Sequence, residues 1–201
     1  EADGCCFQGF ADGSVEVSST AWVDGGTFEG HGRAVTVLVP GGGKLFAGFD
    51  DGGIQVLDYG SMSCPTWVFE HAGAVTSLLF HDGRLFSGAD DGAAKAWDLQ
   101  RMECMETFVA QGGPILALAF DGRWLYTGAE DKSIKVWDLQ RRELVTTLAG
   151  HGRAVRALAC DVSSGGVATL YSGDDDGVVM VWDMRGALPD PGDAAPRHDD
   201  P

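Results

Sequence analysis

The sequence predicts an all-β protein made of small antiparallel sheets of four strands, and three observations predict it. One unit recurs along most of the 201 residues, with Gly48, Gly88 and Gly128 at equal spacing. Inside a unit, short runs of β-branched and apolar residues alternate with Asp-Gly turns, which is the pattern of antiparallel hairpins. The thirty glycines recur at similar places in successive units rather than in one linker, so they mark turns.

The unit at residues 74–99 shows each element in order. It reads as a strand (AVTSLLF), a turn (HDG), a second strand (RLFSGA), a turn (DDG) and a third strand (AAKAWDL). A fourth strand precedes each unit, as in CMETFV at residues 104–109. Such a sheet is apolar on both faces and must stack against neighbouring sheets. Radial stacking gives a β-propeller with one sheet in each blade.

The repeated units follow one another at residues 29–59, 70–99, 110–139 and 149–184. The fourth unit is longer than the others, and a longer loop at residues 162–167 accounts for the difference. An incomplete copy without a first strand precedes them, because Gly9, Asp12 and Val17 repeat the spacing of Gly48, Asp51 and Val56. We expect a partial first blade at residues 1–28, four tandem blades at residues 29–185 and a disordered tail rich in Pro and Asp at residues 186–201.

Three short motifs recur in the same order in these units: a Gly-His pair, a Ser-Gly or Thr-Gly step and a closing Trp-Asp pair. They occur at Gly30-His31 and Gly150-His151, at Ser87-Gly88, Thr127-Gly128 and Ser172-Gly173, and at Trp97-Asp98, Trp137-Asp138 and Trp182-Asp183. In these motifs the sequence resembles the WD-repeat (Trp-Asp repeat) β-propeller family, over roughly residues 29–184. The resemblance implies a non-catalytic scaffold that mediates protein–protein interaction.

The resemblance also implies a ring that this chain does not complete. Family members usually close with about seven blades of roughly 40 residues each, whereas the sequence contains four nearly whole blades and part of a fifth. The chain begins with Glu1 rather than Met, which predicts a fragment or a processed product. We therefore expect an incomplete ring whose end blades expose apolar surface, which favours association or requires further sequence.

Two sets of residues have the types of a serine-hydrolase triad: His71 with Ser87 and Asp91, and His151 with Ser172 and Asp176. Because the same types recur in several blades, we expect a structural role and no catalytic residue. In the family that the sequence resembles, the indole N–H, the hydroxyl, the imidazole and the turn carboxylate satisfy one another. The predicted network residues are His71, Ser87, Asp91, Trp97, Thr127, Asp131, Trp137, His151, Ser172, Asp176 and Trp182.

This predicted network is complete in only two units. Gln111 replaces the histidine in the third unit. Ala47 and Leu57 replace the hydroxyl and the indole in the first unit, which leaves His31 and Asp51 with fewer partners. We expect these two blades to be looser, or to be held mainly by apolar packing.

Acidic residues cluster at one turn of successive blades, at residues 50–51, 90–91, 130–131 and 174–176. Antiparallel strands place these turns at the same edge as the arginines that follow the histidines. One acid of each group belongs to the predicted network, and at least one is spare. The resulting rim either engages a basic or mixed-charge protein or is a set of solvated turns. The rim residues are Arg33, Asp50, Asp90, Glu130, Arg153, Asp174 and Asp175.

One motif points to a particular kind of partner. Residues 182–185 read WDMR, which resembles the WDxR box that helps some WD-repeat proteins dock onto the adaptor of a cullin-type ubiquitin ligase. The chain would then be a substrate-receptor subunit, docked through Asp183 and Arg185. The other units lack the box, since Gln100 and Gln140 stand at the arginine position. The alternative is that Arg185 is a solvated cation at the end of a strand.

Composition and charge exclude several classes of function. Fourteen basic residues against thirty acidic ones give a net charge of -16, which repels nucleic acid and anionic membrane surfaces. The longest apolar runs are about seven residues, too short for a membrane helix. The five cysteines form no CxxC pair and the acids show no calcium-loop spacing, so we expect neither a metal nor a cofactor. We expect an intracellular protein, in the cytoplasm or nucleus, that is not an enzyme.

Overall fold

The computed structural model describes residues 5–19, 26–61, 66–109, 112–162, 168–184 and 188. The secondary structure in these ranges consists of β-strands only. The strands form five antiparallel sheets, numbered here as blades 1 to 5 in chain order. Blade 1 contains β1 (Cys5–Gly9), β2 (Val15–Ser19) and β3 (Gly26–Phe28). Blade 2 contains β4 (Val35–Gly41), β5 (Lys44–Phe49), β6 (Gly53–Leu57) and β7 (Thr66–Phe69).

The remaining blades repeat this order of strands. Blade 3 contains β8 (Val75–His81), β9 (Arg84–Ala89), β10 (Ala93–Asp98) and β11 (Glu103–Val109). Blade 4 contains β12 (Ile115–Phe120), β13 (Trp124–Ala129), β14 (Ile134–Asp138) and β15 (Glu143–Leu148). Blade 5 contains β16 (Val155–Val162), β17 (Ala168–Asp174) and β18 (Val179–Asp183).

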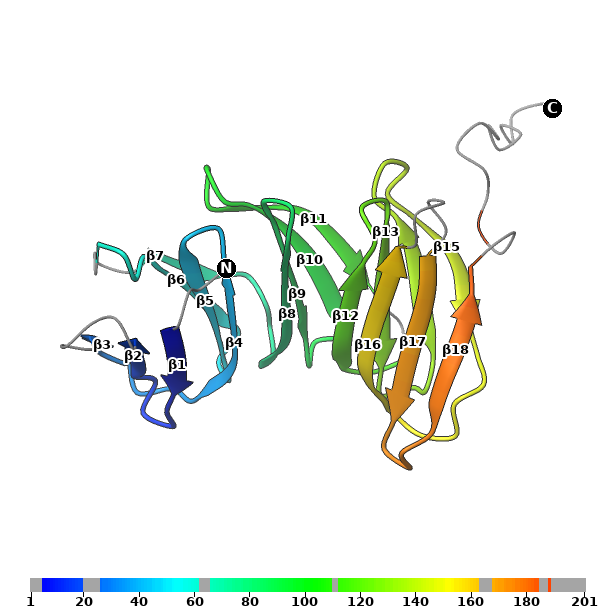
Figure 1. Cartoon of the computed structure of the whole chain (residues 1–201), viewed down its shortest axis with the longest axis horizontal. Helices are drawn as coiled ribbons and strands as arrows, with labels where there is room; N and C mark the ends of the chain where they lie inside the picture. Colours follow the sequence, from blue (N-terminus) through cyan, green and yellow to red (C-terminus); the bar gives the residue numbers. More distant parts are fainter. Residues whose placement is uncertain are drawn as a thin grey trace.

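The blades stand side by side in chain order, and the ring stays open, with blade 1 at one end and blade 5 at the other (Figure 1). Neighbouring strands in each blade are consecutive in the chain. Compared with the complete blades, and within the ranges that the structure describes, blade 1 lacks the first strand and blade 5 lacks the fourth. The prediction of an all-β fold, an incomplete β-propeller of antiparallel blades, is confirmed.

The first strand of each of blades 2 to 5 carries a β-bulge near its start. The register shifts between Val35 and Val37 in β4, and the same shift recurs in β8, β12 and β16. A bulge adds one residue, so side chains three positions apart point to the same face. Both side chains of each such pair pack against the preceding blade. The pairs are Val35 and Leu38, Val75 and Leu78, Ile115 and Leu118, and Val155 and Leu158.

The repeated glycine in the middle of each blade receives the β-branched residue of the next blade. A Cβ atom added to the glycine would collide with that side chain, because the two atoms would lie less than 3 Å apart. The pairs, with this distance to the nearest side-chain atom, are Gly9 and Val35 (2.5 Å), Gly48 and Val75 (2.7 Å), Gly88 and Ile115 (2.5 Å), and Gly128 and Val155 (2.8 Å). The close approach of neighbouring blades therefore requires glycine here.

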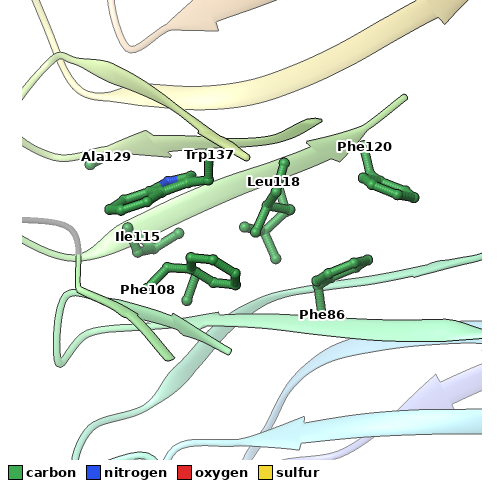
Figure 2. Packing of buried hydrophobic residues seen from close by; sticks show 9 residues of the cluster. Phe86, Phe108, Ile115, Leu118, Phe120, Ala129 and Trp137 are labelled. Carbon is green, nitrogen blue, oxygen red and sulfur yellow. The ribbon is translucent and has the colours of Figure 1, made fainter. Parts of the chain in front are cut away.

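The core lies between the blades as four apolar clusters, one at each seam between neighbouring blades. Figure 2 shows the seam between blades 3 and 4, where Ile115, Leu118 and Phe120 of β12 face Phe86 and Phe108 of blade 3. Burying one such side chain contributes about 1.5–3 kcal/mol relative to leaving it exposed. Each blade is therefore stabilised by its neighbours rather than by a core of its own.

Threonine hydroxyls add a polar contact at two seams. Thr36 Oγ1 lies 2.9 Å from a carbonyl oxygen of its own blade and 2.5 Å from that of Val75 in blade 3. Thr76 makes the same two contacts one blade later. Leu116 and Arg156 hold this position in blades 4 and 5. Among the described residues, this contact thus occurs at the seams of blade 2 with blade 3 and of blade 3 with blade 4.

Candidate functional site

The polar turns of blades 2 to 5 lie at one edge of the molecule. In each of these blades, the turn between the second and third strands is hydrogen-bonded to the connection that enters the blade. The N–H groups of Asp50, Asp90, Glu130 and Asp175 donate to the carbonyl oxygens of Ala34 (3.1 Å), Ala74 (2.9 Å), Pro114 (3.0 Å) and Ala154 (3.2 Å). These turns and connections form the rim, which includes the turn between β17 and β18 at the lower edge of Figure 1.

A chain of hydrogen bonds runs beneath the rim in blade 3. The indole N–H of Trp97 donates to Ser87 Oγ at 2.8 Å, and Ser87 Oγ lies 2.7 Å from His71 Nε2. His71 Nδ1 lies 2.9 Å from Asp91 Oδ2. The Asp91 carboxylate also accepts two backbone N–H groups, one from the connection and one from its own turn. The chain of bonds therefore joins two strands, the connection and the turn.

The partners in blade 3 determine where the protons lie. The Asp91 carboxylate can only accept, so His71 Nδ1 donates to it, and Nε2 of the neutral ring accepts the Ser87 proton. Burial lowers the pKa of His71, although the hydrogen bond to Asp91 acts in the opposite direction. Burial acts to raise the pKa of Asp91, but hydrogen bonds from the backbone and from His71 outweigh it and hold that pKa below its usual value. The imidazole is therefore kept neutral and the carboxylate charged.

Blade 5 repeats the chain of bonds with a different aspartate from the one predicted. The indole N–H of Trp182 donates to Ser172 Oγ at 2.8 Å, and Ser172 Oγ lies 2.6 Å from His151 Nε2. His151 Nδ1 lies 2.9 Å from Asp174 Oδ2. The prediction that placed Asp176 in the network and Asp174 on the rim is therefore wrong.

The exchange of the two aspartates has a geometric cause. Asp174 stands where blades 2 to 4 carry an apolar residue, and its carboxylate is buried beside His151. There the carboxylate also accepts hydrogen bonds from the backbone N–H groups of Asp176 (3.1 Å) and Val178 (3.0 Å). Burial acts to raise the pKa of Asp174, but the hydrogen bond from His151 and these two backbone bonds together hold it below its usual value. The Asp176 carboxylate instead lies 3.4 Å from Arg153 Nε on the surface.

Blade 4 holds part of the network. The indole N–H of Trp137 donates to Thr127 Oγ1 at 3.0 Å, as predicted from their types. The Asp131 carboxylate accepts a hydrogen bond from the backbone N–H of Ser133 in the same turn. Its Oδ2 atom also lies 3.2 Å from Lys135 Nζ. Gln111, which was expected to replace the histidine, lies outside the described residues.

Blade 2 replaces the missing hydroxyl and indole with aromatic packing. His31 Nε2 lies 3.0 Å from Asp51 Oδ2. The His31 ring also contacts Trp67 and Phe49, with ring centroids 4.4 and 4.7 Å apart. Sequence reasoning missed Trp67, which lies on β7. The available signal was the large side chain at residue 49, where blade 3 has Ala89.

The hydroxyl groups of the two complete networks are closed to any substrate. Ser87 is 0% exposed and Ser172 is 2% exposed. Each hydroxyl is hydrogen-bonded to an indole on one side and an imidazole on the other. A catalytic nucleophile must reach its substrate, so this burial favours the structural role that the repetition predicts for these residues.

The charged residues of the rim fall into two groups. The first consists of ion pairs at the two ends of the rim: Arg33 Nε with Asp50 Oδ1 (3.0 Å), Arg153 Nε with Asp176 Oδ2 (3.4 Å) and Arg156 Nε with Asp175 Oδ1 (2.7 Å). The second consists of Asp90 and Glu130 in blades 3 and 4, which are exposed and have no ion pair within the described part of the chain. The middle of the rim therefore presents two acids that have no ion pair in the described part of the chain, although Arg156 acts on Glu130 at longer range.

The residues of the proposed ligase-docking box are only partly described. Asp183 ends β18, at the opposite end of that strand from the rim turn, and Arg185 lies outside the described residues. In the parts of the chain that the structure describes, no helix is long and apolar enough to cross a membrane. The same parts contain no group of three or more His, Cys, Asp or Glu placed to hold a metal ion.

Comparison with protein-family models matches the family described as WD domain, G-beta repeat, at residues 63–98, 102–138 and 142–183. A search of curated proteins finds no match. Among solved structures, the chain is similar to the computationally designed Ika8 protein, with a TM-score of 0.79 and 31% identity over 90% of this chain and 56% of that one. The computationally designed Ika4 protein gives a TM-score of 0.69 and 32% identity over 78% of this chain and 94% of that one.

A chain in the crystal structure of a mitotic checkpoint complex shares the fold alone, with a TM-score of 0.76 at 19% identity over 92% of this chain and 62% of that one. This chain thus spans just over half the length of the Ika8 protein. The three matched repeats cover more than half of the sequence, and blades 2 to 4 all have the same four-stranded order. The chain therefore belongs to the WD domain, G-beta repeat family of β-propellers.

Proposed function

We propose that this chain is a non-catalytic platform for protein–protein interaction, and that the middle of its rim binds a basic or mixed-charge segment of a partner. Membership of a WD-repeat family supports the general role, since such propellers typically bind other proteins. The observation that carries the specific proposal is the position of Asp90 and Glu130. Both are exposed acids on adjacent blades without an ion pair among the described residues.

The sequence explains why these two acids differ from the other rim acids. Arg33 and Arg153 follow the histidines of blades 2 and 5 and pair with acids of their own blades. Glycine stands at this position in the entering connections of blades 3 and 4. Neither acid therefore has an arginine in its own blade's entering connection, although Arg156 of blade 5 interacts with Glu130 at longer range while it pairs with Asp175. A cation supplied by a partner can therefore approach these two acids.

The experiment is affinity capture from extracts of the source cells, quantified by mass spectrometry at low and high salt. The test variant is Asp90→Lys with Glu130→Lys. Its control is Glu103→Lys with Glu143→Lys, which makes the same charge change on exposed residues of the same two blades, at the strand ends away from the rim.

We expect proteins that the wild type and the control retain to be lost from the rim variant, and their capture to weaken as salt rises. An identical set of captured proteins for the rim variant and the wild type would show that this part of the rim is not the binding surface.

Docking onto the adaptor of a cullin-type ubiquitin ligase is the alternative, and it rests on the sequence of residues 182–185. Its test is the same capture with Arg185→Ala. The control is Arg101→Ala, an exposed arginine that follows a Trp-Asp pair in blade 3. Loss of the adaptor from the Arg185 variant alone supports docking, and its absence from the wild type excludes docking under those conditions.

A further inference from the structure

A cavity lies between blades 3 and 4, at the ends of β9 and β10 that are opposite the rim. Its volume is about 180 Å³. Phe86, Trp97 and Leu139 belong to its apolar lining, and Met105, which is 62% exposed, lines it at the surface. An engineered apolar cavity of about 150 Å³ accepts a benzene molecule, so this cavity has room for one large apolar side chain.

The cavity exists partly because blade 3 departs from the repeat in one row of its sheet. This row faces the next blade, and its second residue is valine in blades 2 and 4 but alanine in blade 3. The rows are Phe46, Val56 and Thr66 in blade 2, Phe86, Ala96 and Glu106 in blade 3, and Tyr126, Val136 and Thr146 in blade 4. Val56 is 6% exposed and Val136 is 0% exposed. These valines therefore fill the space that Ala96 leaves open.

Blade 4 contributes the second departure from the repeat. Arg142 stands where blade 3 has Met102. At the seam between blades 2 and 3, Met102 packs against the apolar cluster, and the space beside it and Val56 has no room for a water molecule. The Arg142 side chain is instead 68% exposed, and its Nε lies 3.2 Å from Glu106 Oε1. Changes at residues 96, 106 and 142 thus meet at one place.

The charged groups beside the cavity favour an acidic ligand. Arg84 is exposed and has no ion pair in the described part of the chain. Arg142 is paired with Glu106 through Nε, which leaves the other N–H donors of its guanidinium for a ligand. Apolar walls with cations at the mouth are complementary to an apolar side chain that has a carboxylate beside it.

We propose that this cavity binds a peptide segment of another protein, in which a large apolar side chain stands next to an acidic residue. The apolar side chain fills the space beside Ala96, and the carboxylate pairs with Arg84. A peptide fits better than a free small molecule, because Met105 continues the apolar surface outside the cavity. In addition, no strand of the described chain pairs with the outer edge of β11. The site lies away from the rim and does not depend on the function proposed for the rim.

The test uses the purified full chain and a set of short fluorescein-labelled peptides in a Gly-Ser background. The central residue is Leu, Met, Phe or Ala, and it is flanked by Asp or by Lys. Fluorescence anisotropy gives each affinity. We expect at least one Asp-flanked peptide with a large apolar centre to bind at least about tenfold more tightly than both the Ala peptide with the same flanks and its own Lys-flanked counterpart. The proposal is overturned if no peptide meets both conditions.

Two variants close the cavity with residues that the repeat already uses. Ala96→Val introduces the side chain of blades 2 and 4 and keeps both arginines. Arg142→Met introduces the residue of blade 3, and the backbone allows it because Met102 and Arg142 have φ values of 57° and 59°. Each variant should weaken binding of the preferred peptide at least about tenfold. Unchanged binding in both, or a thermal midpoint that Ala96→Val lowers, would show that the free space is not the binding site.

A third variant, Arg84→Glu, keeps the cavity and reverses the charge beside it. It should abolish the preference for Asp flanks, whereas Lys44→Glu, at the equivalent position of blade 2, should bind as the wild type does. The rim variant, Asp90→Lys with Glu130→Lys, should also bind the peptide normally at an ionic strength that screens distant charges. Failure of the rim proposal therefore leaves this result intact. The same preference for Asp flanks in the Arg84 variant as in the Lys44 variant overturns the assignment of Arg84.

Discussion

Hydrogen bonding in the blade 3 network depends on the protonation of a single residue. His71 must be neutral for Nε2 to accept the hydrogen bond from the Ser87 hydroxyl. Protonation of the imidazole would place a donor N–H at Nε2 opposite the O–H of Ser87. The lowered pKa of His71 means that the unfolded chain binds this proton more readily than the folded chain does. Stability should therefore fall as the pH drops below the ordinary histidine value of 6.5.

Replacing His71 by Gln, the residue type at position 111, should weaken this pH dependence. Between pH 7 and 5 the wild type should lose up to about 1.4 kcal/mol of unfolding free energy per pH unit for this proton, and the variant should lose less. Urea unfolding at several pH values measures both slopes. Equal slopes would mean that His71 is not responsible for the pH dependence.

Gln55 is a residue whose polar group is poorly satisfied. It is buried in β6, and neither atom of its side-chain amide has a hydrogen-bond partner among the described residues. Lys95 holds the same position in blade 3, where its ammonium group reaches Thr107 Oγ1 at 3.1 Å. In β7 the residue opposite Gln55 is Trp67, which offers no such oxygen.

Gln55→Met should therefore raise the free energy of unfolding by about 1 kcal/mol, because it removes an unsatisfied buried amide at similar volume. Chemical denaturation measures the change. Gln8→Met, at an exposed position of blade 1, should have almost no effect and serves as the control. A loss of stability in the Gln55 variant would show that the amide has a partner, such as a buried water.

At the scale of elements, turn geometry decides which side chain joins a network. Spacing from the repeated glycine predicts Asp176 for blade 5, and the backbone bond from Asp175 to Ala154 agrees with that alignment. The side chain that reaches His151 nevertheless belongs to Asp174, at the end of β17. The sequence alignment therefore identifies the turn but not the aspartate, because a residue two positions earlier lies closer to the imidazole.

Alanine substitution separates the two aspartates. Asp174→Ala should lower the free energy of unfolding by about 1–3 kcal/mol, since it leaves a buried imidazole and two backbone N–H groups without their acceptor. Asp176→Ala should change it by at most about 0.5 kcal/mol, as is usual for an exposed residue. Thermal and urea unfolding of both variants provide the comparison. Equal losses would contradict the assignment.

The repeat makes most elements predictable from sequence, and the departures from it have local causes. The motif spacing places the strands of blades 2 to 4 and the Trp-to-hydroxyl bonds, since the same residue types recur at the same positions. It does not reveal that Trp67 takes part in blade 2, because this residue lies outside the repeated motif. Arg156 also pairs at the rim although its equivalents are Thr36, Thr76 and Leu116.

For the whole molecule, stability depends on how many neighbours a blade has. Blades 2, 3 and 4 are packed on both faces, whereas blades 1 and 5 are packed on one. In an open stack of repeats, the ends separate from the rest at lower free energy than the centre. We therefore expect the four seams, rather than one common core, to determine the order in which the chain opens.

Amide hydrogen exchange should follow this order. The slowest exchange is expected in β9 and β13, in the middle strands of blades 3 and 4, and the fastest in β1 and β18, at the two free ends. Mass spectrometry of protease fragments resolves these strands. Uniform protection from one end to the other would show that the five blades open as a single unit.

The threonine contacts of blades 2 and 3 have a mechanical consequence. They connect carbonyl groups across two successive seams, and leucine replaces them at the seam between blades 4 and 5. Blades 2, 3 and 4 are therefore linked through threonine hydroxyls, whereas the seam between blades 4 and 5 has a weaker thiol hydrogen bond, from Cys160 Sγ to the carbonyl oxygen of Phe120 at 3.0 Å. Under tension, we expect blade 5 to shift on blade 4 more readily than blades 2 to 4 shift on one another.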